Sequence, residues 1–143
     1  MVSLVRLYAK ILAEKENINL IIIDGSPGIG CPVILSITGI DVSLLVTEPT
    51  ISGIHDQALE LLRHFNILSL VCINMYDINK NITEKILNFC KDNNIKVVGM
   101  IPFNSKVNEA MVNRKTIMEY SPKSDVAKEL ENIWKEIAYF IEI

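Results

Sequence analysis

The chain has 143 residues, of which 50% are hydrophobic and 22% are charged, a composition that supports a folded domain with its own core. Its net charge of -3 gives no electrostatic reason to expect nucleic-acid binding. No apolar run approaches the roughly 20 residues of a membrane span, and residues 1–9 lack the features of a signal peptide. Three widely spaced cysteines fit a reducing compartment. We therefore expect a cytoplasmic protein with a single domain over residues 1–143.

In the first half of the chain, hydrophobic periodicity predicts helices that alternate with short apolar strands. Residues 4–12 carry apolar side chains on one helical face, and Asn17 closes that helix. Residues 19–23 and 42–46 are continuous apolar runs of strand length. Residues 54–65 then repeat apolar side chains at helical spacing, which indicates an amphipathic helix.

The second half continues the alternation with two more strands, residues 69–73 and 96–101. Between them, Asn81 and Glu84 resemble a capping box that opens a helix. The connection over residues 104–120 contains a short helix near 107–112, and a final helix begins near Ser121-Pro122. We expect six residues of this last helix to face the core: Val126, Leu130, Ile133, Trp134, Ile137 and Ile141.

Strands that are apolar on both faces and separated by helices predict an α/β fold, with a mostly parallel sheet and helices on both faces. Ligands of such sheets bind beyond the carboxyl ends of the strands. All four predicted strands end in polar residues, among them Asp24, Glu48, Asn74 and Asn104. Any one of these ends also fits an ordinary polar turn, whereas all four at one edge favour a binding crevice.

The first of these strand ends carries the most chemical information. The apolar run 21–23 ends in Asp24, and a glycine-rich loop follows at once: Gly25, Ser26, Pro27, Gly28, Ile29 and Gly30. A carboxylate at the end of a buried strand suits a magnesium or phosphate site. The G-x-x-x-x-G-K-[ST] loop that should accompany it occurs nowhere in the 143 residues.

The segment 24–33 resembles the switch II segment of the MinD/ParA-type P-loop ATPases, which are relatives of the nitrogenase iron protein. The similarity continues, in the family's order and spacing, through residues 46–50, 73–77, 99–104 and 107–111. It covers roughly residues 4–140 and is nearest to the MinD-like subgroup that carries an inserted ferredoxin domain. The resemblance implies a P-loop NTPase-like fold of the SIMIBI type that lacks the N-terminal P-loop strand.

The resemblance also implies roles for individual residues. Asp24 matches the aspartate that holds Mg2+ through a water, Asn74 matches the asparagine that binds adenine, and Asp56 matches an aspartate near the P-loop lysine. Pro102 and Asn104 match a second loop beside the base, although the family commonly has an acid at the position of Asn104. From the residues alone, Asp24 also fits a cap, Asn74 a turn, and Asp56 a solvated surface.

Residues 74–77 also show the N-x-x-D spacing with which GTPases read guanine. The lysine usual at the second position is Met75 here, which favours adenine. The ligands implied by the resemblance are therefore ATP and Mg2+.

Cys31 lies seven residues after Asp24, the same interval as a cluster-ligating cysteine of the nitrogenase iron protein. That resemblance implies a [4Fe-4S] cluster in the parent protein or at a dimer interface. Packing in a core or an interface is the alternative for Cys31, because iron–sulfur sites need several thiolates.

These inferences describe the C-terminal part of a MinD/ParA-like ATPase, which cannot hydrolyse ATP without a P-loop. Its expected partners are a second copy, a P-loop-bearing N-terminal half, and an iron–sulfur or electron-transfer protein. Removal of the P-loop strand is expected to leave either a gap in the sheet or an exposed apolar edge that can pair with another chain. The alternative is a degenerate, non-catalytic domain used for dimerisation or partner binding. An unrelated flavodoxin-like domain fits the alternation but not the ordered motifs.

Overall fold

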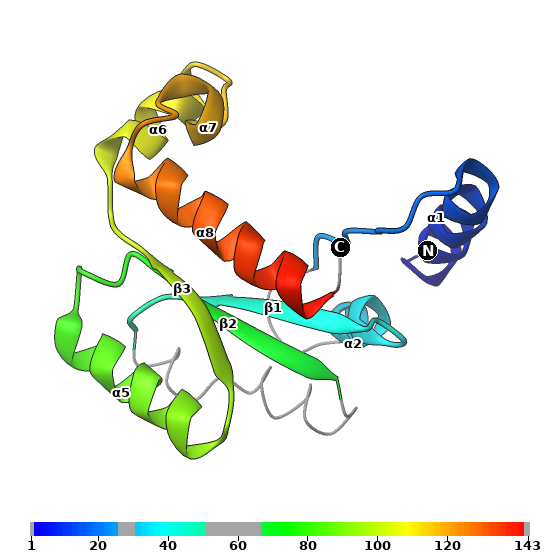
Figure 1. Cartoon of the computed structure of the whole chain (residues 1–143), viewed down its shortest axis with the longest axis horizontal. Coiled ribbons are helices and arrows are strands. Elements are labelled where there is room, and N and C mark those ends of the chain that lie inside the picture. Colours follow the sequence, from blue (N-terminus) through cyan, green and yellow to red (C-terminus); the bar gives the residue numbers. More distant parts are fainter. Residues whose placement is uncertain (1, 26–30, 51–66, 142–143) are drawn as a thin grey trace.

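The computed structural model describes residues 2–25, 31–50 and 67–141, and its centre is a parallel three-stranded sheet (Figure 1). The sheet has the order β1 (Val42–Thr47), β2 (Leu68–Asn74), β3 (Lys96–Ile101). The sequence predictions for these three strands are confirmed to within one residue at each end. The predicted helix over residues 54–65 lies outside the described residues.

The central strand β2 is buried on both faces, and this burial builds the core. Val71 and Ile73 pack against Ile86 and Cys90 of α5 (Lys80–Asp92) on one face. On the other face, buried residues of β2 and β3 pack against α8 (Asp125–Phe140): Leu70, Cys72 and Val98 contact Ile133. Figure 1 shows α5 and α8 on opposite sides of the sheet. The predicted α/β class, with helices on both faces of a parallel sheet, is confirmed.

The N-terminal boundary of α5 differs from the capping box predicted for it. Asn79 is the N-cap, because its side chain accepts a hydrogen bond from the backbone N–H of Ile82. Asn81 and Glu84 both lie inside the helix, so they form no capping box. Asn79 and Asn81 could each cap a helix that begins in this segment. The turn that leaves β2 places the cap at Asn79.

The last helix begins later than predicted, at Asp125 instead of near Ser121. The side chain of Ser124 caps it by accepting from the N–H of Ala127, and a separate short helix, α7 (Ile117–Tyr120), precedes it. Trp134 was expected in the core but is 45% exposed, because α8 buries the face that carries Ile133. The short helix predicted near residues 107–112 is confirmed as α6 (Ser105–Val112).

The N-terminal helix is confirmed as α1 (Val2–Glu16), with Asn17 following it in the left-handed conformation. In Figure 1 α1 stands apart from the sheet. It contacts α2 (Cys31–Ile37), a helix the sequence analysis did not anticipate, where the Arg6 guanidinium donates to the Leu35 carbonyl at 2.7 Å. The apolar face of α1 is exposed. No described helix combines the length and apolar character that a membrane span needs.

Residues 19–23 do not form the predicted strand. The side chains of Ile21, Ile22 and Ile23 are exposed, Ile22 by 76%, and Leu20 is half-buried. A strand exists only as part of a hydrogen-bonded ladder, and no described segment pairs with these residues. These residues have the apolar composition of a strand, but the hydrogen-bonded ladder that a strand needs is missing from the described part of the chain.

Strand β1 is correspondingly open on the side away from β2. Within the described residues it pairs with β2 alone. Leu44 and Val46 lie in register with the buried Leu70 and Cys72, yet Val46 is 56% exposed. Among the described residues, β1 is therefore an apolar edge strand whose outer backbone groups have no ladder partner.

Gly99 sets the distance between β3 and α8. A Cβ atom added at Gly99 would overlap Cγ1 and Cδ1 of Ile133, a residue buried against the sheet. The register between β2 and β3 skips Val98, so that Cys72 lies opposite Gly99. The helix can approach the sheet this closely only because residue 99 has no side chain.

We predict that Gly99→Ala lowers the free energy of unfolding by about 1–3 kcal/mol, because it overpacks the contact with Ile133. Urea unfolding followed by circular dichroism measures the change. In an Ile133→Ala background the same substitution should cost less, because the colliding atoms are gone. An equal loss of stability in both backgrounds would show that the contact with Ile133 is not the reason why a side chain at position 99 is unfavourable.

Candidate functional site

The carboxyl ends of β2 and β3 lie side by side, and they carry the residues predicted to contact the nucleotide base. Asn74, the last residue of β2, is half-buried and in register with Ile101, the last residue of β3. Pro102 follows directly and is also half-buried. The predicted base-side residues Asn74 and Pro102 therefore share one edge of the sheet.

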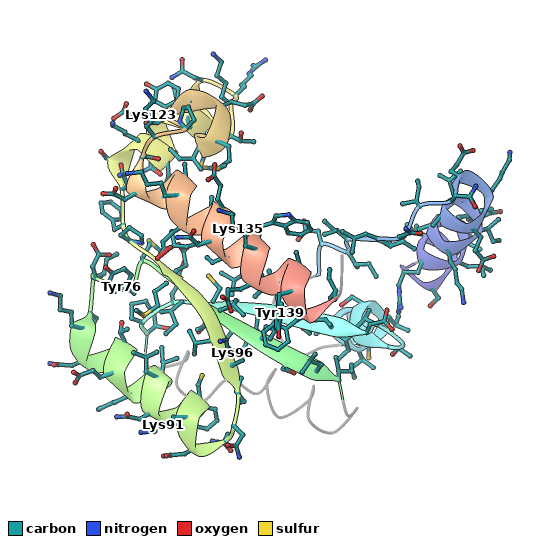
Figure 2. All side chains as sticks on the ribbon, in the orientation of Figure 1. Tyr76, Lys91, Lys96, Lys123, Lys135 and Tyr139 are labelled. Carbon is teal, nitrogen blue, oxygen red and sulfur yellow. The ribbon has the colours of Figure 1, made fainter. Side chains whose placement is uncertain are left out.

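The turn after β2 has an unusual backbone conformation. Met75 has a φ of 52°, in the left-handed region of backbone conformation that residues other than glycine rarely adopt. The backbone N–H of Ile78 donates to the Met75 carbonyl at 3.1 Å, and the Thr83 hydroxyl of α5 donates to the Tyr76 carbonyl at 2.7 Å. Tyr76 marks this turn in Figure 2, near the start of α5. Several contacts thus hold a conformation that costs free energy.

Two hydrogen bonds join this turn to the end of β3. The Tyr76 N–H donates to the Ile101 carbonyl at 3.2 Å. The Phe103 N–H donates to Oδ1 of Asp77 at 2.7 Å, which bridges 26 residues of sequence. Of the motif 74–77, Asp77 is therefore the residue whose side chain connects the two loops.

Asn104 caps helix α6. Its Oδ1 accepts a hydrogen bond from the Lys106 N–H at 3.0 Å, and its backbone is extended, as at other N-caps. An aspartate oxygen could accept the same bond, so either side chain satisfies this position. Further along, Tyr120 donates from its hydroxyl to Oε2 of Glu109 at 3.1 Å, and this bond raises the pKa of Tyr120.

The magnesium side of the predicted site is described only in part. Asp24 is exposed and follows the unpaired residues 19–23. A Cβ atom on Gly25 would lie 3.6 Å from Oγ of Ser36, which puts this glycine beside α2. No hydrogen bond or ion pair joins Asp24 to the loops after β2 and β3 within the described ranges. The remaining switch residues, 26–30, and Asp56 lie outside those ranges.

The three cysteines occupy different environments. Cys31, the first residue of α2, is exposed, whereas Cys72 and Cys90 are each 1% exposed and belong to the clusters on opposite faces of the sheet. Burial raises the pKa of Cys72 to about 11, with a further contribution from the negative charge of Glu129. Burial also raises the pKa of Cys90. Both buried thiols are consequently protonated near neutral pH.

A [4Fe-4S] cluster does not fit the described residues of one chain. One exposed thiol is available, and in the parts described no group of three His, Cys, Asp or Glu side chains converges. Such clusters need several thiolates. Cys31 would therefore need further ligands from outside these residues.

Sequence reasoning missed Thr83, whose hydroxyl stabilises the turn after β2. The available signal was a threonine on the apolar face of a predicted helix, close to Ile82 and Ile86. A buried hydroxyl at such a position needs a nearby acceptor, and here the acceptors are the carbonyls of Tyr76 and Asn79.

Comparison with known proteins identifies one matching family. Residues 57–140 match the model of the 4Fe-4S iron sulfur cluster binding proteins of the NifH/frxC family. An uncharacterized protein of Methanocaldococcus jannaschii is 30% identical over 131 residues, which are 90% of this chain and 43% of that protein.

The fold is also similar to solved structures of MinD. The MinC:MinD cell division complex of Aquifex aeolicus superposes with a TM-score of 0.81 at 18% identity, over 97% of this chain and 60% of that one. The septum site-determining protein MinD of Pyrococcus horikoshii, complexed with Mg-ADP, gives 0.67 at 17% identity, over 82% of this chain and 49% of that one. The chain thus spans about half the length of these relatives.

We predict that Cys31 alone reacts rapidly with iodoacetamide at pH 8, because it is the exposed thiol and the other two are buried and protonated. Mass spectrometry of the folded protein should show one adduct, and three after denaturation in urea. Cys31→Ser should remove the rapid adduct. Two rapid adducts in the native protein would contradict the burial described here.

Proposed function

Because this chain belongs to the NifH/frxC family of 4Fe-4S iron sulfur cluster binding proteins, we propose that it is the C-terminal part of a MinD/ParA-like ATPase. In this proposal the chain carries the magnesium aspartate, the switch loop and the base-side loops. It hydrolyses ATP only when a P-loop segment is supplied, either in the same polypeptide or by a partner chain. The P-loop lysine and backbone amides are what position and neutralise the phosphates in such enzymes.

The open edge of β1 is the observation that carries this proposal. Leu44 and Val46 are exposed on a strand that pairs on one side within the described residues, and the apolar residues 21–23 have no ladder partner there either. One further parallel strand would satisfy the backbone groups of β1 and cover apolar surface. The relatives are about twice as long as this chain, which leaves length for such a strand.

We assign the site residues as follows within this proposal. Asp24 holds Mg2+ through a water, and the loop Gly25 to Gly30 responds to the γ-phosphate. Asn74 binds adenine through an amide that both donates and accepts, with Pro102 beside it, and Asn104 contributes chiefly as the cap of α6. Asp56 lies near the P-loop lysine. Mg-ADP bound to a MinD of the same fold supports this choice of ligands.

A [4Fe-4S] cluster would be bound only at an interface between this chain and another. Cys31 is exposed at the start of α2, so it is accessible to a second copy or to an iron–sulfur or electron-transfer partner. A dimer would bring two such thiols together, and further ligands would have to come from the segment outside this chain. The family description supports a cluster in the parent protein.

The second candidate is a non-catalytic domain that dimerises or binds a partner. The same open edge of β1 favours it, because an exposed apolar strand pairs with any suitable strand, including one from another copy. The structure of MinD in complex with MinC shows that proteins of this fold can serve as binding surfaces. The two candidates differ in whether a P-loop accompanies this chain.

We predict that the native polypeptide, captured from its source with an antibody against this chain, has a mass well above 16.1 kDa. Peptide mapping should then find an upstream G-x-x-x-x-G-K-[ST] sequence. A mass of 16.1 kDa with a separate P-loop chain in the same complex would support supply by a partner. A 16.1 kDa chain captured without any P-loop protein would contradict the ATPase proposal and favour the non-catalytic domain.

We predict that Asp24→Asn lowers magnesium-dependent ATP hydrolysis by the P-loop-containing assembly about 10–100-fold, because a carboxylate acting through a metal-bound water is lost. Phosphate release measures the rate, and circular dichroism checks the fold. Asp41→Asn is the matched control, since Asp41 is an exposed acid just before β1, at the opposite end of the strands. Unchanged turnover in Asp24→Asn would refute the assigned role.

A further inference from the structure

Arg6 of α1 supplies a positive charge to the last turn of α2. Its guanidinium donates to the Leu35 carbonyl at 2.7 Å, across 29 residues of sequence. The last four carbonyls of a helix have no partner within that helix, and a cation is favoured beside them. In α2 the Ile34 carbonyl accepts from the Thr38 N–H, and Arg6 satisfies the next carbonyl along the chain. A specific charged contact therefore joins α1 to α2.

The buried side chains of α2 anchor that helix in the domain. Val33 and Ile37 are each 8% exposed, and they pack against Ile40 and Ile67, which lie shortly before β1 and β2. Helix α1, in contrast, stands apart from the sheet in Figure 1. Its bond to Leu35 therefore attaches it to a helix that is itself fixed to the body of the domain.

The segment that carries Asp24 lacks the support of a strand. Asp24 follows residues 19–23, which have no ladder partner within the described ranges. Where this segment leaves α1, the Ile18 N–H donates to the Ala13 carbonyl at 2.9 Å, and Asn17 takes the left-handed conformation. A segment without a ladder keeps its position through its remaining contacts. The position of Asp24 is therefore tied at one end to α1.

At the other end, this segment lies against α2. A Cβ atom on Gly25 would be 3.6 Å from Oγ of Ser36, the residue that follows Leu35. Contact therefore runs from Arg6 through α2 to the backbone beside Asp24. An added strand could pair with residues 21–23, but Gly25 lies beyond that run and would still depend on α2.

We propose that Arg6 is a positioning residue, which holds the backbone at Asp24 and Gly25 in place by tying α1 to α2. A contact between residues so far apart in sequence restricts the chain between them. Within the described residues Lys10, one turn further along α1, is exposed and forms no hydrogen bond or ion pair. The consequence for Mg2+ rests on the proposed function, whereas the tie between Arg6 and Gly25 does not.

The test compares Arg6→Ala and Arg6→Lys with Lys10→Ala, the control that removes an exposed cation from the same helix. In the 143-residue chain, NMR measures hydrogen exchange at the Thr38 amide and the resonance of the Gly25 amide. The Asn93 amide, which donates to the Phe89 carbonyl at 3.1 Å, is the internal reference at the end of α5. In the P-loop-containing assembly, phosphate release is measured against Mg2+ concentration. Circular dichroism checks the fold of each variant.

We expect the Thr38 amide to exchange about fivefold faster in Arg6→Ala, with the Gly25 resonance shifted and Asn93 unchanged. Arg6→Lys and Lys10→Ala should stay close to the wild type, because lysine keeps a charged donor at position 6 and Lys10 holds nothing. The Mg2+ concentration for half-maximal hydrolysis should rise about fivefold in Arg6→Ala with little change in the maximal rate, because a displaced Asp24 weakens metal binding.

Unchanged Thr38 exchange or an unchanged Gly25 resonance in Arg6→Ala would overturn the proposal. An unaltered Mg2+ requirement in an active Arg6→Ala assembly would overturn it as well, because Arg6 would then act on the fold alone. A wild-type assembly without magnesium-dependent hydrolysis would instead refute the proposed function. In that case the Gly25 resonance still decides whether Arg6 holds this segment.

Discussion

The burial of β2 on both faces is the constraint on which the rest of this structure depends. Consecutive residues of the strand, such as Val71 and Cys72, point to opposite faces and pack against different helices. Neither α5 nor α8 can therefore shift without opening the core. The strand therefore delivers Asn74 and the turn behind it to a defined place. The neighbouring strand β3 is held just as closely, because Gly99 lets Ile133 of α8 approach its backbone.

The edge that we propose binds the base is well ordered by hydrogen bonds, whereas the proposed phosphate side is described only in part. Hydrogen bonds from Tyr76 and Phe103 tie two loops to each other, and Asn104 continues that order into α6. Asp24, by contrast, is exposed and follows an apolar segment that has no ladder partner within the described residues. Within the described residues, the hydrogen bonds between loops are therefore concentrated at the carboxyl ends of β2 and β3.

The strands of the sheet could be predicted because their signal is local: short apolar runs bounded by polar turns. Helix starts were less predictable, since Asn79 and Asn81 offer the same capping chemistry and tertiary contacts choose between them. Residues 19–23 have the composition of a strand but form none, because a strand requires a hydrogen-bonded partner and no described segment provides one. The Asp77–Phe103 bond joins positions 26 residues apart, so no local pattern could reveal it.

The unpaired edge of β1 has a consequence for handling the chain by itself. Within the described residues, the backbone groups on the outer edge of β1 have no ladder partner, so they form a template for an extended segment. At high protein concentration the most abundant such segment belongs to another copy. Yield and solubility should then depend on dilution, and on whether a complementary chain is made at the same time.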